Sequence, residues 1–212
     1  MATRVEKLSP PSVDDVFAGA ARSVIELLDD ERSQPGGEWS DAVSSWNSAR
    51  IRKIMRRGRA SAWVRAQDVP GVTVAVGTAE VRAFVPGPVD QTPHDLARLQ
   101  IQTTPLDEPV EIQAAPELGS NELVIAVTPD VDMSWGKLAA QCAHAGQRAW
   151  ERGDRSAREQ WRASGSMIRI VHPDSALWRH LQADTSRKIS TIRDGGFTEI
   201  PPGTNTTIAW WA

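Results

Sequence analysis

The chain has little sulfur and no phenol chemistry. Cys142 is the single cysteine among 212 residues, which excludes an intramolecular disulfide and any zinc site built from several cysteines. The sequence contains no tyrosine, so no phenol is available here as a general acid or base. Hydrolytic, acid–base or nucleophilic chemistry must therefore come from other side chains.

Long apolar runs are also missing. The longest purely apolar run in the C-terminal half is Leu123–Val127, far shorter than the roughly 20 residues that span a bilayer. The first residues, MATRVEKLSPPS, hold no apolar core of signal-peptide length. We therefore expect a cytoplasmic protein with no membrane partner. The net charge of -3 argues against a protein that wraps nucleic acid non-specifically. Local basic patches are still compatible with this net charge.

The first part of the chain, residues 1–102, has no indicated function and is predicted to mix helices with short strands. Apolar residues at helical spacing predict an amphipathic helix over 13–30, and a second helix is predicted over 39–56. Short strands are then predicted within 61–86, at 61–67, 72–77 and 80–86. The proline-containing stretch 103–121 has no clear period and is predicted to be a linker.

From residue 122 to 212, predicted strands alternate with predicted helices. The strands are expected at 123–128, 167–171, 186–191 and 205–211. The helices are expected at 136–152, 155–164 and 175–183. This alternation is typical of the α/β class.

Three polar side chains share one face of the helix predicted over 136–152. Lys137, Gln141 and His144 lie at positions i, i+4 and i+7. Open α/β sheets form their ligand crevice beyond the carboxyl ends of strands, where this helix begins, and its first turn offers N–H groups to an anion. The alternative is that the three residues are only the solvated face of an amphipathic helix.

A carboxylate beside two glycines forms a second motif, Asp194-Gly195-Gly196, followed by Thr198. Such a turn lets the backbone approach a ligand closely. The alternative is an ordinary hairpin turn in which Asp194 bonds its own backbone.

Taken together and in this order, the two segments resemble the type II peptidyl-tRNA hydrolase family. In the first segment the matching residues are Met133, Gly136, Lys137, Ala139, Ala140, Gln141, His144 and Ala145. In the second they are Asp194, Gly196, Thr198, Pro202, Gly203 and Thr206 or Thr207. The resemblance implies a small mixed β-sheet flanked by helices. It also implies hydrolysis of the ester between a peptide, or N-blocked amino acid, and the 3′ ribose of tRNA, without metal or cofactor.

The resemblance also implies roles for the matching residues. Asp194 would orient or deprotonate water, and Lys137 would offer its ammonium to the oxyanion or to the terminal phosphate of the CCA end. Thr198 and Gln141 would hold water or the ribose. His144 would either take part in the chemistry or serve as a buried hydrogen bonder. Gly136 is expected to lie at the bound substrate.

The sequence is less basic than the family pattern around the expected site. Asp132 and Trp135 stand where the family usually has lysines, Phe197 replaces an arginine or lysine, and Glu199 replaces a glutamine. Phosphate contacts supply much of nucleic-acid affinity, so these changes weaken the tRNA interpretation. Trp135 and Phe197 either stack on the terminal adenine, worth about 1–3 kcal/mol per base, or simply pack.

A basic run at residues 50–65, which contains no acidic residue, offers compensation. We expect Arg56, Arg57 and Arg59 to contact tRNA phosphates; the alternative is a solvated helix end. Three functions stay open: a hydrolase, a silent tRNA-end- or protein-binding module of the same fold, and a transferase that uses charged tRNA. The oligomeric state also stays open, a homodimer included.

Overall fold

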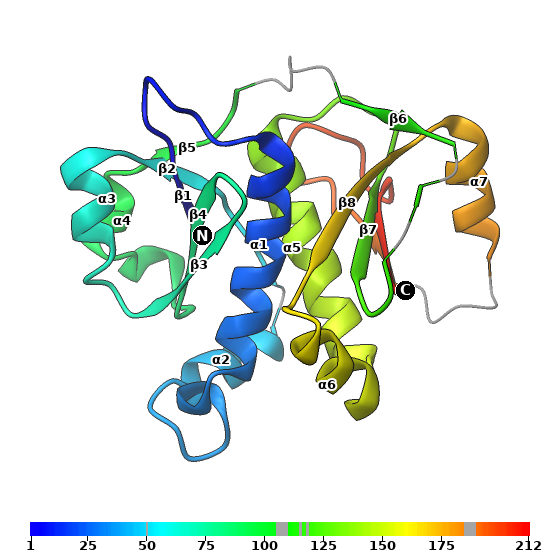
Figure 1. The fold of residues 1–212 in the computed structure, drawn as a ribbon. Helices are drawn as coiled ribbons and strands as arrows, with labels where there is room; N and C mark the ends of the chain where they lie inside the picture. Colours follow the sequence, from blue (N-terminus) through cyan, green and yellow to red (C-terminus); the bar gives the residue numbers. More distant parts are fainter. Residues whose placement is uncertain (50, 105–109, 115, 118, 185–189) are drawn as a thin grey trace.

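A computed structural model describes residues 1–49, 51–104, 110–114, 116–117, 119–184 and 190–212. Two five-stranded mixed sheets lie on either side of a central pair of helices, α1 (Val13–Asp29) and α5 (Trp135–Arg152), as Figure 1 shows. α1 packs against both sheets and against α5, whereas α5 packs against the second sheet. The fold is therefore α/β, as predicted, and the two helices join its halves.

The N-terminal region forms the first sheet. Its strands are β1 (Ala2–Arg4), β2 (Arg56–Gly58), β3 (Gly71–Val76), β4 (Ala79–Phe84) and β5 (Gln100–Ile101). They lie in the order β3-β4-β1-β2-β5, with β1 and β2 parallel and the other pairs antiparallel. β3 and β4 confirm the strands predicted at 72–77 and 80–86.

The helix predicted over 39–56 is wrong in its second half. α2 (Ser40–Asn47) ends where the Ser48 hydroxyl donates to the Ser44 carbonyl at 2.9 Å, a side-chain bond that competes with the helical backbone. Farther along, Arg56 N donates to Met1 O at 3.0 Å. Pairing with the distant β1 therefore makes residues 56–58 a strand, which no local pattern indicated.

The strand predicted at 61–67 is also wrong, because these residues lie in α3 (Ala60–Ala66). Trp63 and Ala66 are buried, three residues apart, while Val64 and Arg65 are exposed. That spacing is one helical face rather than a two-residue alternation, and the alanines favour helix. The remaining short elements of this region are η1 (Glu31–Ser33), η2 (Val89–Gln91) and α4 (His94–Ala97).

The second sheet has the predicted mixed character. Its strands are β6 (Ile112–Gln113), β7 (Leu123–Val127), β8 (Ile168–Pro173), β9 (Ser190–Arg193) and β10 (Asn205–Trp211). β8 is parallel to β6 and β7, and β10 is antiparallel to β7 and β9. Of the strand predicted at 186–191, residues 186–189 lie outside the described residues, and β9 begins at Ser190. β6 falls inside the predicted linker 103–121.

The helices of this half agree with the prediction. α5, α6 (Arg155–Ala163) and α7 (Ser175–Ala183) match the three expected ranges. The side chains of Ser134, Asp154 and Asp174 cap them by accepting a hydrogen bond from a backbone N–H of the first turn. α1 likewise confirms the helix predicted over 13–30. Among the described residues, no helix is both long and apolar enough to cross a bilayer.

One hydrophobic core runs through α1, α5 and the facing sheets. The two helices meet closely through small residues, because a Cβ built on Gly146 would lie 2.9 Å from the Cβ of Ala21. Cys142 is fully buried in this core, and burial raises its pKa well above the ordinary value, which leaves it inert. The division of the chain at residues 102 and 121 stays a prediction, but the core is continuous across it.

We expect Gly146→Val to destabilise the whole protein, because its methyl groups would collide with α1. Overpacking of this kind costs about 1–3 kcal/mol. The matched control is Gly87→Val, where a built Cβ meets nothing within 4 Å. Denaturant unfolding followed by tryptophan fluorescence measures both variants. Equal free energies of unfolding for the two would contradict the close α1–α5 packing.

Candidate functional site

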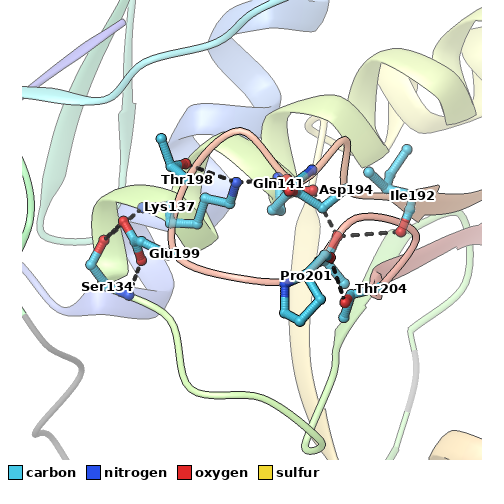
Figure 2. A network of polar contacts seen from close by, with 11 residues as sticks. Ser134, Lys137, Gln141, Ile192, Asp194, Thr198, Glu199, Pro201 and Thr204 are labelled. Carbon is cyan, nitrogen blue, oxygen red and sulfur yellow. Dashed lines mark hydrogen bonds and ion pairs between the residues drawn. The ribbon is translucent and has the colours of Figure 1, made fainter.

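The two motif segments meet at one edge of the second sheet. β7 and β10 are antiparallel, with Val127 opposite Thr207, and Thr128 N donates to Thr206 O at 2.9 Å. The carboxyl end of β7 therefore lies beside the amino end of β10. Because β7 leads to α5 and the loop 194–204 leads into β10, the loop and the first turns of α5 face each other (Figure 2).

Asp194 is the centre of the site and is only 8% exposed. Lys137 Nζ donates to its Oδ2 at 2.6 Å, and Gln141 Nε2 donates to the same oxygen at 2.8 Å. Gly196 N donates to Oδ1 at 2.8 Å. A buried carboxylate needs such donors and an opposite charge, and all of them come from the two predicted motifs.

The loop that carries Asp194 is held by its own backbone. Asp194 N donates to Thr204 O at 2.9 Å, and Gly203 N donates to Asp194 O at 2.8 Å. Gly196 has a φ of +73°, and a Cβ built on it would lie 2.6 Å from the Cβ of Pro202. Glycine meets both demands, so the glycines and prolines of the motif fix the direction of the carboxylate.

Lys137 and Thr198 offer free protons beside this carboxylate. Lys137 Nζ also donates to Thr198 Oγ1 at 3.1 Å. These two bonds leave one of the three ammonium protons for a bound substrate. Since Thr198 accepts from Lys137, its own hydroxyl proton points elsewhere and is available to a ligand.

Gln141 is engaged by the protein at both ends of its amide. It is 4% exposed, donates to Asp194, and accepts from Thr206 Oγ1 at 2.7 Å. This position suits a residue that holds Asp194 in place. We predicted that Gln141 contacts water or the ribose, but its amide group is buried and already hydrogen-bonded at both ends.

Other protein groups form hydrogen bonds with the start of α5. Ser134 N and Oγ donate to the Glu199 carboxylate at 2.8 and 2.9 Å, and Ser134 Oγ accepts from Lys137 N at 3.2 Å. Trp135 N donates to Thr104 O at 3.1 Å. A carboxylate is stabilised at a helix N-terminus, so Glu199 occupies the position that the sequence suggested for a substrate anion.

Two other residues of the first turn of α5, Trp135 and Gly136, pack against other parts of the protein. A Cβ built on Gly136 would lie 1.8 Å from Gln102 O, so Gly136 allows that carbonyl to approach the helix. Trp135 is 9% exposed and lies in the core, which favours packing over stacking. Phe197 is 65% exposed beside Gly195 and stays available for stacking.

His144 lies farther along the same face of α5 and contacts the N-terminal region. Lys53 Nζ lies 3.1 Å from His144 Nδ1, donates to Gln147 Oε1, and sits 4.7 Å from the ring centroid of Trp46. Burial lowers the pKa of Lys53 to about 7. Burial, reinforced by the charge of Lys53, lowers the pKa of His144 well below its ordinary value. A neutral imidazole that accepts from Lys53 is the consistent state.

The predicted basic contacts lie on and beside β2. Arg56 Nη1 donates to Leu99 O at 2.8 Å, and burial lowers its pKa. Arg57 donates to Gln100 Oε1 at 3.0 and 2.7 Å, and Arg59 is exposed just before α3. The interpretation as a solvated helix end is wrong for Arg56 and Arg57, which belong to β2, whereas Arg65 of the same run does lie exposed in the last turn of α3.

Sequence reasoning missed four partners of the site. Glu199 was noted only as a departure from the family pattern, although a serine directly before a helix is a signal for capping. Gln102 ends the predicted N-terminal region, Thr104 lies at the start of the predicted linker, and Lys53 was one member of a basic run. No local pattern places these three against α5.

These features define an α/β protein in which a lysine from a central helix meets a carboxylate and a hydroxyl from a glycine-rich loop. The family model described as Peptidyl-tRNA hydrolase PTH2 matches residues 121–210. A peptidyl-tRNA hydrolase of Halobacterium salinarum is 34% identical over 90 residues, covering 41% of this chain and 80% of that protein. One from Staphylothermus marinus is 37% identical over 92 residues, covering 40% and 76%. The mitochondrial peptidyl-tRNA hydrolase 2 of Homo sapiens is 31% identical over 121 residues, covering 53% and 67%. The chain belongs to the type II peptidyl-tRNA hydrolase family, which confirms the predicted resemblance.

We expect Lys53→Met to flatten the pH dependence of stability between about pH 7 and 10.5. The pKa of Lys53 is about 7 in the folded protein and 10.5 without burial. In that window the unfolded chain holds the proton that the folded protein has lost, so wild-type stability rises with pH. One proton gives a slope of up to about 1.4 kcal/mol per pH unit.

Denaturant unfolding across this pH range measures the slope. Lys7→Met, at an exposed lysine, is the control and should keep the wild-type slope. If Lys53→Met keeps it too, Lys53 is not neutralised by burial against α5.

Proposed function

We propose that this protein hydrolyses the ester that joins a peptide, or an N-blocked amino acid, to the 3′ ribose of tRNA. The observation that carries the proposal is the triad of Lys137, Asp194 and Thr198, drawn from the two segments that match the family. Membership of the family supports peptidyl-tRNA as the substrate class. The chemistry needs only water and the side chains of the site.

Asp194 activates the water in this mechanism. A carboxylate has about four lone-pair positions, and three of them accept from Lys137, Gln141 and Gly196. The fourth accepts a proton from the attacking water, whose oxygen adds to the ester carbonyl carbon. That proton then passes to the 3′ oxygen of the ribose as the carbon–oxygen bond breaks. The products are a free acid and tRNA with a 3′ hydroxyl.

Lys137 stabilises the charge that develops on the carbonyl oxygen. Its third N–H is an available cationic donor, whereas the N–H groups of Ser134, Trp135 and Lys137 at the start of α5 already serve Glu199, Thr104 and Ser134. A donor aimed at an oxyanion contributes about a hundredfold to a thousandfold in rate. Thr198 holds the water or the ribose with its free proton, Gln141 fixes Asp194, and His144 acts as a structural contact.

The finer features of substrate binding belong to the same proposal. Phe197 stacks on the terminal base, and Arg57 and Arg59, which are exposed, contact tRNA phosphates. Arg56 is committed to Leu99 O and contributes less. The cytoplasmic location stays a prediction, and the human relative is named mitochondrial.

A binding module without catalysis is the second candidate. The closure of the site favours it, since Asp194 is 8% exposed and Glu199 covers the first turn of α5. Incubation of the wild-type protein with N-acetylated aminoacyl-tRNA decides between the two. Release of the acyl amino acid supports the enzyme, and binding without release supports the module.

We expect Asp194→Asn to lower kcat/KM by about a hundredfold to ten-thousandfold, the usual contribution of a positioned general base. The amide keeps the size of the side chain but cannot take the proton. The control is Asp132→Asn, which removes an exposed carboxylate just before α5 and should leave the rate near wild type. Circular dichroism verifies that both variants fold. A wild-type rate for Asp194→Asn would remove Asp194 from the chemistry.

A further inference from the structure

A basic cavity of about 450 Å³ lies in the N-terminal half and is lined by residues of β2 and β5. Figure 1 shows these two strands at its upper left. Its charged lining residues are Lys7, Arg57, Arg59 and Arg98. Its apolar lining includes the side chains of Leu99 and Ala62. The cavity is built entirely from residues that precede the segment matched by the family, so family membership assigns nothing to it.

Within the part of the chain that the structure describes, the four cations of this cavity form no ion pair. Arg57 is held by the Gln100 amide, a neutral partner, at 3.0 and 2.7 Å. Among the described residues, no carboxylate lines the cavity or forms an ion pair with its four cations. Glu6 lies near Arg59 but already accepts from Arg4 and Ala60 N. Gathered cations repel one another and attract an anion.

The cavity is connected to the candidate active site by a short piece of chain. Gln100 lines it, and four residues later Thr104 O accepts from Trp135 N at 3.1 Å. Four extended residues span at most about 14 Å. The start of α5 therefore lies within about 20 Å of the cavity wall, or roughly six nucleotides of a duplex strand at 3.4 Å each.

We propose that this cavity binds a phosphate of the tRNA acceptor stem while the 3′ end occupies the site at Lys137 and Asp194. The ligand chemistry is a phosphodiester held by guanidinium and ammonium donors, with Leu99 and Ala62 against the sugar. The identity of the RNA rests on the proposed function. Glu199 already occupies the helix N-terminus near the site, whereas the cations of the cavity form no ion pair among the described residues and are available for a phosphate.

The test measures binding of deacylated tRNA in an Asp194→Asn background, so that hydrolysis plays no part. Arg59→Ser with Arg98→Ser removes two cations from the cavity. The matched control, Arg155→Ser with Arg179→Ser, removes two exposed cations on α6 and α7, away from the cavity and from the basic run. Each phosphate contact contributes about 0.9 to the slope of log K against log salt. Because the cavity holds one phosphate, the cavity variant should lower that slope by about 0.9, and the control should not.

The ratio of the cavity variant's Kd to the wild-type Kd should correspondingly shrink roughly three- to fourfold between 50 and 200 mM salt. If the slope of log K against log salt for tRNA binding is the same in the cavity variant as in the control, the proposal is overturned. Adenosine monophosphate and inorganic phosphate form a second arm. If either binds the cavity as tightly as tRNA does, the site is a nucleotide or phosphate pocket and the RNA assignment is overturned. Because hydrolysis is assayed separately in the wild type, an inactive protein with the predicted slope refutes only the proposed function.

Discussion

The ion pair between Lys137 and Asp194 is the interaction on which the site depends. The two side chains are 10% and 7% exposed and their charged atoms lie 2.6 Å apart. Both ions lose hydration when they are buried. The free-energy cost of this loss is offset only by good geometry and further hydrogen bonds, here from Gln141 and Gly196. Removing one partner of such a pair typically costs about 3–5 kcal/mol. The pair therefore fastens the loop 194–204 to α5 and concentrates charge where an ester would react.

α5 is placed by both halves of the protein. The second sheet supports one side of it, and α1 packs against it through the contact of Ala21 with Gly146. Lys53 and Thr104, from the N-terminal half, bond to groups on its reactive face and its first turn. The N-terminal half thus positions the helix that carries Lys137. It also contributes the basic cavity, whose cations form no ion pair among the described residues.

Local patterns predicted the second half of the chain well because its helices and strands are long enough to show a clear periodicity and its helices begin at recognisable capping residues. They failed at residues 56–58, where pairing of β2 with the distant β1 decides the structure, and at 61–67, where a short helix has a residue pattern similar to the alternation of a strand. At the site, the resemblance implied that Lys137 and Asp194 serve the same reaction, and the structure adds the ion pair between them. It did not predict that Glu199 covers the helix N-terminus or that Trp135 is buried, since both depend on segments remote in sequence.

The most direct test of the central claim is a double-mutant cycle for hydrolysis of N-acetylated aminoacyl-tRNA, with Lys137→Ala, Asp194→Asn and the double variant. If the lysine and the carboxylate act as one unit, the double variant loses little more kcat/KM than the worse single variant. Folded proteins, verified by circular dichroism, and the wild type complete the cycle. Losses that multiply in the double variant, or a wild-type rate in either single variant, would contradict the account.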